Sequence, residues 1–286
     1  MRIGCVMPVG IYEKALPASL SWDERLSMAA EAGYDFVEMS IDESEARLGR
    51  LNWSESEIAT MRSAIANAGV PIFALGLSAH RKYPLGSADP ELRSKAFEIF
   101  RQAIELASEL GVKVIQVMGY DVFYEPSTPD SGARFLEGLH QGACWASSAG
   151  VMLALENVDV PFVNSVEKAM RFVQVVNSPW FHVYPDMGNL VAAGYDPVSQ
   201  LQLAKSHLVG VHVKDAMPGV VRGVPFEAGI VPFHDVFKAL EEMGFWGPLA
   251  VEMWADLDAS GDPFKTAVQA RKLVDHLVRT AWGNLE

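Results

Sequence analysis

The sequence predicts an α/β protein that folds as one (β/α)8 TIM barrel, a closed ring of eight parallel strands with a helix after each strand. The first observation is a repeated signature in which a helical segment ends at a glycine and a short apolar run follows. It occurs at Gly33, Gly69, Gly111 and Gly150, so that successive copies lie 36, 42 and 39 residues apart. A unit of about 40 residues that alternates helix and strand is typical of a parallel sheet. The second observation is that 286 residues contain eight such apolar runs.

These runs are apolar at nearly every position, as expected of parallel strands that are covered on both faces. In chain order the predicted strands are Ile3–Val6, Phe36–Met39, Ile72–Leu77, Val114–Met118, Val151–Glu156, His182–Asp186, Val209–Lys214 and Leu249–Met253. An open doubly wound sheet is the alternative, but no G-x-G-x-x-G fingerprint follows the first run, so nothing indicates a dinucleotide site. Because no linker or low-complexity stretch interrupts the pattern, residues 1–286 are expected to form one domain.

Two of the intervening helices carry clear start signals. The segment Ser21–Ala32 begins with a serine and has acidic residues in its first turn, which favours the amino-terminal end of a helix. In the segment Ser54–Ala68, Ser54 precedes Glu57 by three residues, which is the spacing of a capping box.

Composition limits the classes of partner. The chain has 36 acidic and 23 basic residues, a formal net charge of −13, which argues against nucleic acid or an anionic membrane as the main partner. No apolar run is long enough to span a membrane, and Pro8 and Pro17 interrupt the amino-terminal stretch, so no signal peptide is expected. Cys5 and Cys144 lie far apart, which fits two thiols in a reducing compartment. We therefore expect a cytoplasmic protein.

Four consecutive predicted strands deliver polar residues to one end of the barrel. Glu156, Asp186, His212 and Glu252 each follow an apolar run on strands five to eight. The carboxyl ends of barrel strands form the active-site face, so these side chains are expected to converge. Three clustered carboxylates would repel one another unless a cation lay between them. The pattern therefore predicts a site for one divalent metal ion, with Zn²⁺ favoured and Mn²⁺ or Co²⁺ possible.

Seven further residues at the same end are candidates for binding substrate or phosphate: Lys14, Glu38, His80, Arg81, Asn189, Lys214 and Arg222. Lys14 lies in the segment Gly10–Lys14, expected to be the loop after strand one, and Arg222 lies in one of the last loops, where such barrels often bind phosphate.

Some of these candidates have structural alternatives. Glu38, expected at the end of strand two, could instead point inward and bond a neighbouring strand-end group. Asn189 could cap a turn, Lys214 could be the counterion of Asp215, and the segment that holds His80 could be a solvated loop.

The two glutamates predict proton transfer. Glu156 and Glu252, on strands five and eight, would face each other across the barrel with the metal between them. A metal-bound α-hydroxy ketone has an acidic C–H between its hydroxyl and carbonyl groups. One carboxylate could remove that proton and the other could return it on the opposite face, which inverts the configuration. If one group did both at neighbouring carbons, the result would be aldose–ketose isomerisation, and residue spacing does not separate the two reactions.

Several segments of the chain resemble a known group of enzymes. It is similar to the xylose-isomerase-like TIM-barrel superfamily and, within it, to the L-ribulose/L-xylulose 5-phosphate 3-epimerases of L-ascorbate and related pentose catabolism. The similar segments are Gly10–Pro17, Asp35–Ser40, Leu77–Arg81, Val114–Gln116, Gly119–Val122, Tyr184–Asp186, Val211–Asp215, Val224–Phe226 and Val251–Trp254.

The resemblance implies that Glu156, Asp186, His212 and Glu252 bind the metal and that Glu156 and Glu252 are the catalytic acid/base pair at C3. It also implies a phosphorylated ketopentose as substrate and a homodimer. Epimerases of free ketoses have a His at the position of Asn189, and the Asn here favours the phosphopentose branch.

Three alternatives remain for the function. A hexulose-6-phosphate isomerase, or another ketose isomerase or epimerase of the superfamily, would use the same residue types. A metal-dependent endonuclease would need more His and Asp ligands and a basic cleft. A non-catalytic sugar-binding barrel would not need both Glu156 and Glu252.

Overall fold

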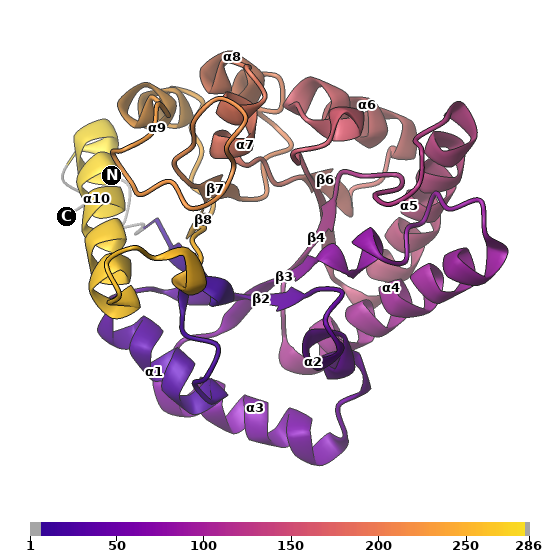
Figure 1. The fold of residues 1–286 in the computed structure, drawn as a ribbon, viewed down its shortest axis with the longest axis horizontal. Helices are drawn as coiled ribbons and strands as arrows, with labels where there is room; N and C mark the ends of the chain where they lie inside the picture. The colour runs from indigo at the N-terminus through magenta and orange to yellow at the C-terminus, as the bar shows by residue number, and fades with distance from the viewer. Residues whose placement is uncertain (1–6, 284–286) are drawn as a thin grey trace.

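The chain forms the predicted parallel barrel, seen in a computed structural model that describes residues 7–283 (Figure 1). The strands pair in the order β6-β5-β4-β3-β2-β1-β8-β7. The two ends of this order meet through two isolated parallel bridges, Val183 with Leu208 and Asp186 with His212. Strands that are consecutive in the chain are therefore neighbours all round the ring, which is the order of a (β/α)8 barrel.

The strands are β1 (Val9–Tyr12), β2 (Phe36–Ile41), β3 (Ile72–Leu77), β4 (Val114–Met118), β5 (Met152–Glu156), β6 (Phe181–Val183), β7 (Val211–Val213) and β8 (Leu249–Val251). The sequence predicts β3 and β4 with these same bounds. The last three strands are shorter than predicted, and Asp186, Lys214 and Glu252 lie beyond their last residues.

The first strand is the main correction. The predicted strand Ile3–Val6 lies outside the described residues, and the segment expected to be a loop after it instead contains β1. Pro8 does not break the sheet, because its carbonyl accepts a hydrogen bond from the amide of Leu249 at 3.0 Å. Gly10 is a packing requirement, since a Cβ there would lie 2.0 Å from the ring of Phe36. Proline and glycine thus mark the start of β1 and a close contact within it.

Helices form an outer ring around the strands (Figure 1). They are α1 (Trp22–Glu31), α2 (Glu45–Leu48), α3 (Glu55–Ala68), α4 (Pro90–Leu110), α5 (Pro129–Ala149), α6 (Val166–Val176), α7 (Met187–Ala192), α8 (Pro197–Gln202), α9 (Phe233–Glu242) and α10 (Pro263–Trp282). Short 3-10 turns are η1 (Glu13–Ala15), η2 (Gly49–Asn52), η3 (Ser78–Arg81), η4 (Pro161–Val163) and η5 (Ala255–Leu257). Among residues 7–283, no helix combines the length and the apolar character needed to cross a membrane.

The predicted helix starts are confirmed by their capping contacts. Ser21 caps α1 and Ser54 caps α3, each in a reciprocal capping box with the glutamate three residues later. At the other end, Gly69 closes α3 in the left-handed conformation, with φ of 68°. The repeated glycine signature therefore has the conformational cause that the sequence predicts.

We expect Ser54→Ala to lower the free energy of unfolding by about 1 kcal/mol, because the amide of Glu57 would lose the hydroxyl that accepts its hydrogen bond. Urea denaturation followed by circular dichroism measures this change. Ser63→Ala is the matched control, since Ser63 is also exposed on α3 but lies in the body of the helix. Equal losses in the two variants would contradict the capping role.

Candidate metal and catalytic site

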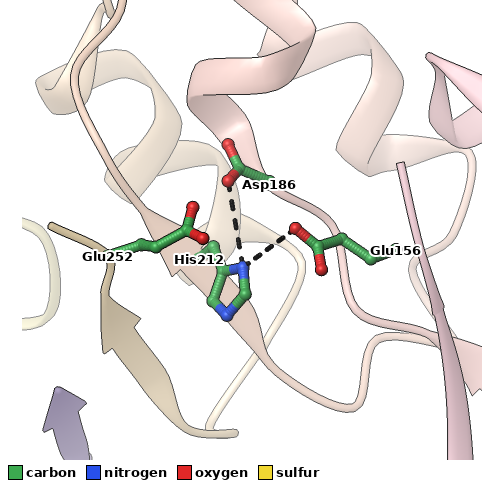
Figure 2. A group of neighbouring side chains, drawn as sticks. All are labelled: Glu156, Asp186, His212 and Glu252. Atoms are coloured by element: carbon green, nitrogen blue, oxygen red, sulfur yellow. Dashed lines mark hydrogen bonds and ion pairs between the residues drawn. The ribbon is translucent and has the colours of Figure 1, made fainter. Parts of the chain in front are cut away.

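The four predicted ligands converge at one end of the barrel (Figure 2). Glu156 is the last residue of β5, and Asp186 is the N-cap residue of α7, directly beyond β6. His212 lies in β7, and Glu252 directly follows β8. One ligand atom from each of the four residues lies within 4.8 Å of the others. The sequence predicts this convergence, which follows from four neighbouring strands ending at one rim.

His212 and Lys214 make the closest polar contacts in this cluster. The Nδ1 atom of His212 lies 3.2 Å from Glu156 Oε1 and 3.8 Å from Asp186 Oδ2. The ammonium of Lys214 lies 2.7 Å from Asp186 Oδ2 and 2.7 Å from Glu252 Oε2. Two basic groups therefore balance part of the negative charge of three carboxylates.

The surroundings shift the pKa values of the carboxyls in different directions. Burial raises the pKa of Glu156, and the positive charge of His212 only partly offsets this effect. Burial also raises the pKa of Asp186 in spite of the ammonium of Lys214. For Glu252 the charges of Lys214 and His212 outweigh burial and lower its pKa. The pKa values of the two glutamates at this site are thus shifted in opposite directions.

The donor set fits a divalent cation. Three carboxylates and one imidazole suit Zn²⁺, Mn²⁺ or Co²⁺. Asp186 Oδ2 is fully buried in this donor set, where the ammonium of Lys214 is its ion-pair partner at 2.7 Å.

Glu38 is not at the pocket surface, contrary to its prediction as a substrate-binding residue at a strand end. It lies in the middle of β2 and is 0% exposed. Its Oε2 atom is 2.7 Å from His212 Nε2, and its Oε1 atom accepts hydrogen bonds from Gln116 and Tyr184. Burial favours the neutral form of His212, but Glu38 and Glu156 outweigh it and raise the pKa of His212 well above its ordinary value. The alternative interpretation from the sequence, an inward polar group bonded to a neighbour, describes Glu38.

Gln116 and Tyr184 also belong to this buried network, although no sequence pattern predicts a role for either of them. Gln116 interrupts the otherwise apolar strand β4, and this polar residue at an inward position was the available signal. Tyr184 directly follows β6 and is fully buried.

Four predicted cations line a small cavity of about 80 Å³ beside the ligands: Lys14, Arg81, Lys214 and Arg222. Lys14 is held by Asp42 at 2.7 Å. The guanidinium groups of Arg81 and Arg222 lie over the rings of Phe123 and Trp254, and neither makes an ion pair within the described part of the chain. Both remain able to bind an anion.

His80 is directed away from this cavity, so the structure contradicts its prediction as a substrate ligand. Its side chain is 2% exposed, lies 3.2 Å from the carbonyl of Ala96 and packs edge-on against Phe100. Burial lowers its pKa to about 4, so the ring is neutral near pH 7. The 3-10 turn η3 directs His80 toward α4 and Arg81 toward the cavity.

Asn189 lies in the cavity wall and also stabilises the loops around it. Its side chain donates to the carbonyl of Asn157 at 3.0 Å and accepts from Lys214 at 3.0 Å. Its backbone amide donates to Asp186 Oδ1 at 2.7 Å, which is the N-cap bond of α7. The alternative that Asn189 caps a turn is wrong, because Asp186 is the cap of α7 and Asn189 is the residue whose amide is capped. The alternative pairing of Lys214 with Asp215 is wrong, because Asp215 accepts from the amides of Ala216 and Gly229.

A second cavity, of about 680 Å³, shares Lys214, Glu252 and Trp254 with the first. Apolar residues such as Phe226 and Leu257 contribute to its walls. Of the four ligands, Glu252 lines both cavities, whereas Glu156 and His212 line the small one.

Comparisons with known proteins identify the family of the chain. A model of the xylose isomerase-like TIM barrel family matches residues 26–277. The L-ribulose-5-phosphate 3-epimerase UlaE of Salmonella paratyphi A is 45% identical over 268 residues, which cover 94% of this chain and 94% of that protein.

Two solved structures are similar at lower identity. An L-ribulose 3-epimerase has a TM-score of 0.80 and 20% identity, and the match covers 96% of each chain. A D-psicose 3-epimerase from Clostridium cellulolyticum H10 has a TM-score of 0.82 and 17% identity, and the match covers 95% of this chain and 99% of that one. These two similarities show a shared fold.

Proposed function

The chain belongs to the xylose isomerase-like TIM-barrel family, and on this premise we propose that it is a metal-dependent L-ribulose-5-phosphate 3-epimerase. The enzyme interconverts L-ribulose 5-phosphate and L-xylulose 5-phosphate, an isomerase reaction of carbohydrate metabolism. The observation that carries this proposal is the 45% identity to a protein of that name across 94% of both chains.

In this proposal Glu156, Asp186, His212 and Glu252 hold one divalent cation. Zn²⁺ is the favoured ion in this proposal, and Mn²⁺ and Co²⁺ would fit the same imidazole and carboxylate donors. When bound, the cation polarises the carbonyl and hydroxyl oxygens of the ketose and so acidifies the C3 proton. The cluster of four ligand atoms within 4.8 Å supports this assignment.

Glu156 and Glu252 then act as the acid/base pair. They come from β5 and β8, on different sides of the barrel mouth. One carboxylate removes the proton from C3 to give an ene-diolate, and the other donates a proton to the opposite face of C3. Inversion at C3 follows from the position of the two groups on either side of the substrate.

For the phosphate we propose Arg81, Arg222 and Lys14, which line the small cavity beside the metal ligands. Arg81 and Arg222 are the better candidates, because an arginine without a carboxylate partner can bind phosphate through two parallel hydrogen bonds. Lys214 and Asn189 lie closer to the ligand cluster and are proposed to contact the sugar oxygens. The homodimer expected from the resemblance stays a prediction.

An experiment in D₂O tests the reaction. Incubation of L-ribulose 5-phosphate with the metal-loaded protein should form L-xylulose 5-phosphate with deuterium at C3, because the incoming proton comes from a carboxylate that exchanges with solvent. Nuclear magnetic resonance of the sugar locates the label, and a heat-inactivated sample is the control. Deuterium at C1 or C2 alone would contradict the epimerase and indicate an aldose–ketose isomerase.

A further inference from the structure

The two ring nitrogens of His212 face different environments. Nδ1 faces the carboxylates of Glu156 and Asp186, at 3.2 and 3.8 Å. Nε2 faces the interior of the barrel, where Glu38 Oε2 lies 2.7 Å away. The imidazole ring therefore connects the proposed metal site to a carboxylate beneath it.

Glu38 is itself held by groups from two other strands. Its Oε1 atom accepts a hydrogen bond from Gln116 of β4 at 2.8 Å. It accepts a second from the hydroxyl of Tyr184, the residue after β6, at 2.5 Å. With His212 from β7, three donors from three sides of the barrel converge on a carboxylate that is 0% exposed. A buried carboxylate with this many donors has a fixed orientation.

We infer that Glu38 is a positioning residue that fixes the proton of His212 on Nε2 and so keeps Nδ1 free to bind the metal. Nε2 lies closer to Glu38, at 2.7 Å, than Nδ1 lies to Glu156, at 3.2 Å. When a cation occupies the ligand cluster it replaces the proton on Nδ1, and the remaining ring proton on Nε2 is donated to the Glu38 carboxylate, which can only accept a hydrogen bond. The lone pair is then on Nδ1, directed at the other three ligands. A carboxylate behind a metal-bound histidine also orients the ring and increases its basicity. This inference rests on the metal site of the proposed function.

The variant Glu38→Gln tests this role because it keeps the shape and changes the donor pattern. If the amide oxygen keeps the bonds from Gln116 and Tyr184, the amide nitrogen faces His212 Nε2 and donates to it. The imidazole proton then moves to Nδ1, where it competes with the metal. We expect the dissociation constant for Zn²⁺, measured by competition with a chromophoric chelator, to rise about 10- to 100-fold.

A second measurement reads the tautomer itself. In ¹⁵N-histidine-labelled wild-type protein loaded with Zn²⁺, nitrogen NMR should show a protonated Nε2 and a metal-bound Nδ1 for His212. In Glu38→Gln this pattern should be lost or weakened. Asp121→Asn is the matched control, because Asp121 is also a fully buried carboxylate held by side-chain donors, Ser127 and Ser131, and contacts none of the four ligands. Its Zn²⁺ affinity and histidine signals should stay those of the wild type.

The outcomes separate this role from the metal site. If Glu38→Gln folds and binds Zn²⁺ as tightly as the wild type, with the same tautomer, the positioning role is wrong and the metal site stands. If the wild type binds no divalent cation, the proposed metal site is wrong and the proposed role of Glu38 is wrong as well.

If Glu38→Gln does not fold, Tyr184→Phe replaces it, since that variant removes one donor to Glu38 and no proposed ligand. An unchanged affinity in Tyr184→Phe would then overturn the inference, and a weaker one would support it.

Discussion

Replacing Glu156 or Glu252 with glutamine is expected to reduce kcat for the epimerisation of L-ribulose 5-phosphate by about 10²- to 10⁴-fold. A glutamine amide keeps the size of the side chain and an oxygen that can still bind a cation, but it can neither accept nor donate the C3 proton. Each variant removes one of the two proposed bases and leaves the other carboxylate of the ligand cluster in place.

Three measurements distinguish the loss of a base from unfolding and from loss of the metal. Circular dichroism should show an intact barrel, and metal analysis should show that the loss of activity exceeds any loss of bound metal. Each variant should still exchange the C3 proton of one epimer with D₂O, because the remaining carboxylate can reach one face of the substrate. Glu43→Gln is the control, since Glu43 follows β2 at the same end of the barrel and is bonded to Tyr124. Near-normal turnover in either glutamine variant would contradict the mechanism with two bases.

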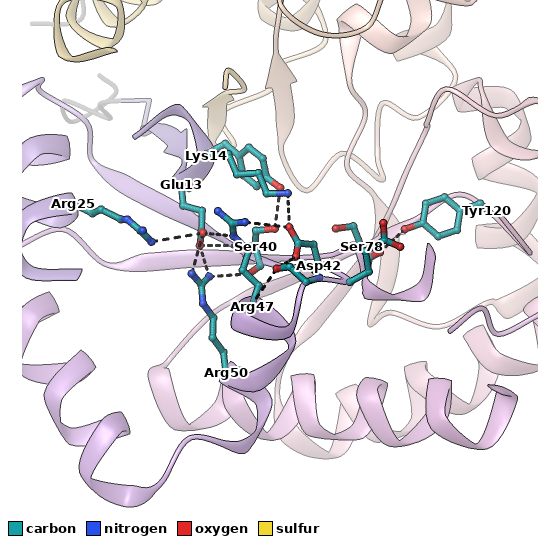
Figure 3. A network of polar contacts seen from close by, with 12 residues as sticks. Glu13, Lys14, Arg25, Ser40, Asp42, Arg47, Arg50, Ser78 and Tyr120 are labelled. Carbon is teal, nitrogen blue, oxygen red and sulfur yellow. Dashed lines mark hydrogen bonds and ion pairs between the residues drawn. The ribbon is translucent and has the colours of Figure 1, made fainter. Parts of the chain in front are cut away.

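The largest expected effect on stability comes from Glu13. This carboxylate, 1% exposed, lies among three arginines in a buried network (Figure 3). Arg47 Nε lies 2.8 Å from Glu13, Arg50 Nη1 lies 2.5 Å from it, and Arg25 Nη1 lies 3.8 Å from it. Ser40 donates its amide to the same carboxylate at 2.9 Å. Burial alone would raise the pKa of Glu13, but Arg50 and the donated hydrogen bonds outweigh this effect and lower it.

We expect Glu13→Ala to lower the free energy of unfolding by about 3–5 kcal/mol, because the buried guanidinium groups of Arg25 and Arg50 would lose their counterion. Urea denaturation at pH 7 measures this loss. The contribution of Glu13 is present above the ordinary pKa of a carboxyl and disappears as the pH falls through the lowered pKa of the folded state. The difference between the wild type and the variant should therefore shrink in acid.

Glu98→Ala is the control for this experiment. Glu98 forms an exposed ion pair with Lys95 at 3.0 Å, and its removal should cost less than about 1 kcal/mol. If Glu13→Ala lost no more stability than Glu98→Ala, the buried network would not be a significant source of stability.

The barrel could be predicted from the sequence because its strands are covered on both faces and are apolar almost throughout. The same rule located the four ligands, since a charged residue directly after such a run is conspicuous. It misplaced Glu38, because the strand predicted over Phe36–Met39 put this residue at its end. In the structure β2 continues through Ser40, whose hydroxyl is bonded to Tyr12 at 3.1 Å.

Other contacts could not be predicted from local patterns. Arg25 lies in α1, whereas Arg47 and Arg50 lie in α2 and η2 after β2, and they meet at Glu13 only when β1 and β2 are paired. The opposite directions of His80 and Arg81 depend on one 3-10 turn, and adjacent residues in such a turn have no sequence period that assigns a face.

The junction of β6 and β7 has a thermodynamic consequence. The ring closes there through isolated bridges, and one of them pairs Asp186 with His212, two of the proposed metal ligands. An ion bound by both residues would link β6 to β7, the two strands at the ends of the pairing order. Any ligand that binds only the folded state adds its binding free energy to the stability of that state. Part of that binding free energy would stabilise the pairing of β6 with β7. Tighter binding of the ion should therefore be accompanied by slower amide hydrogen exchange along this junction.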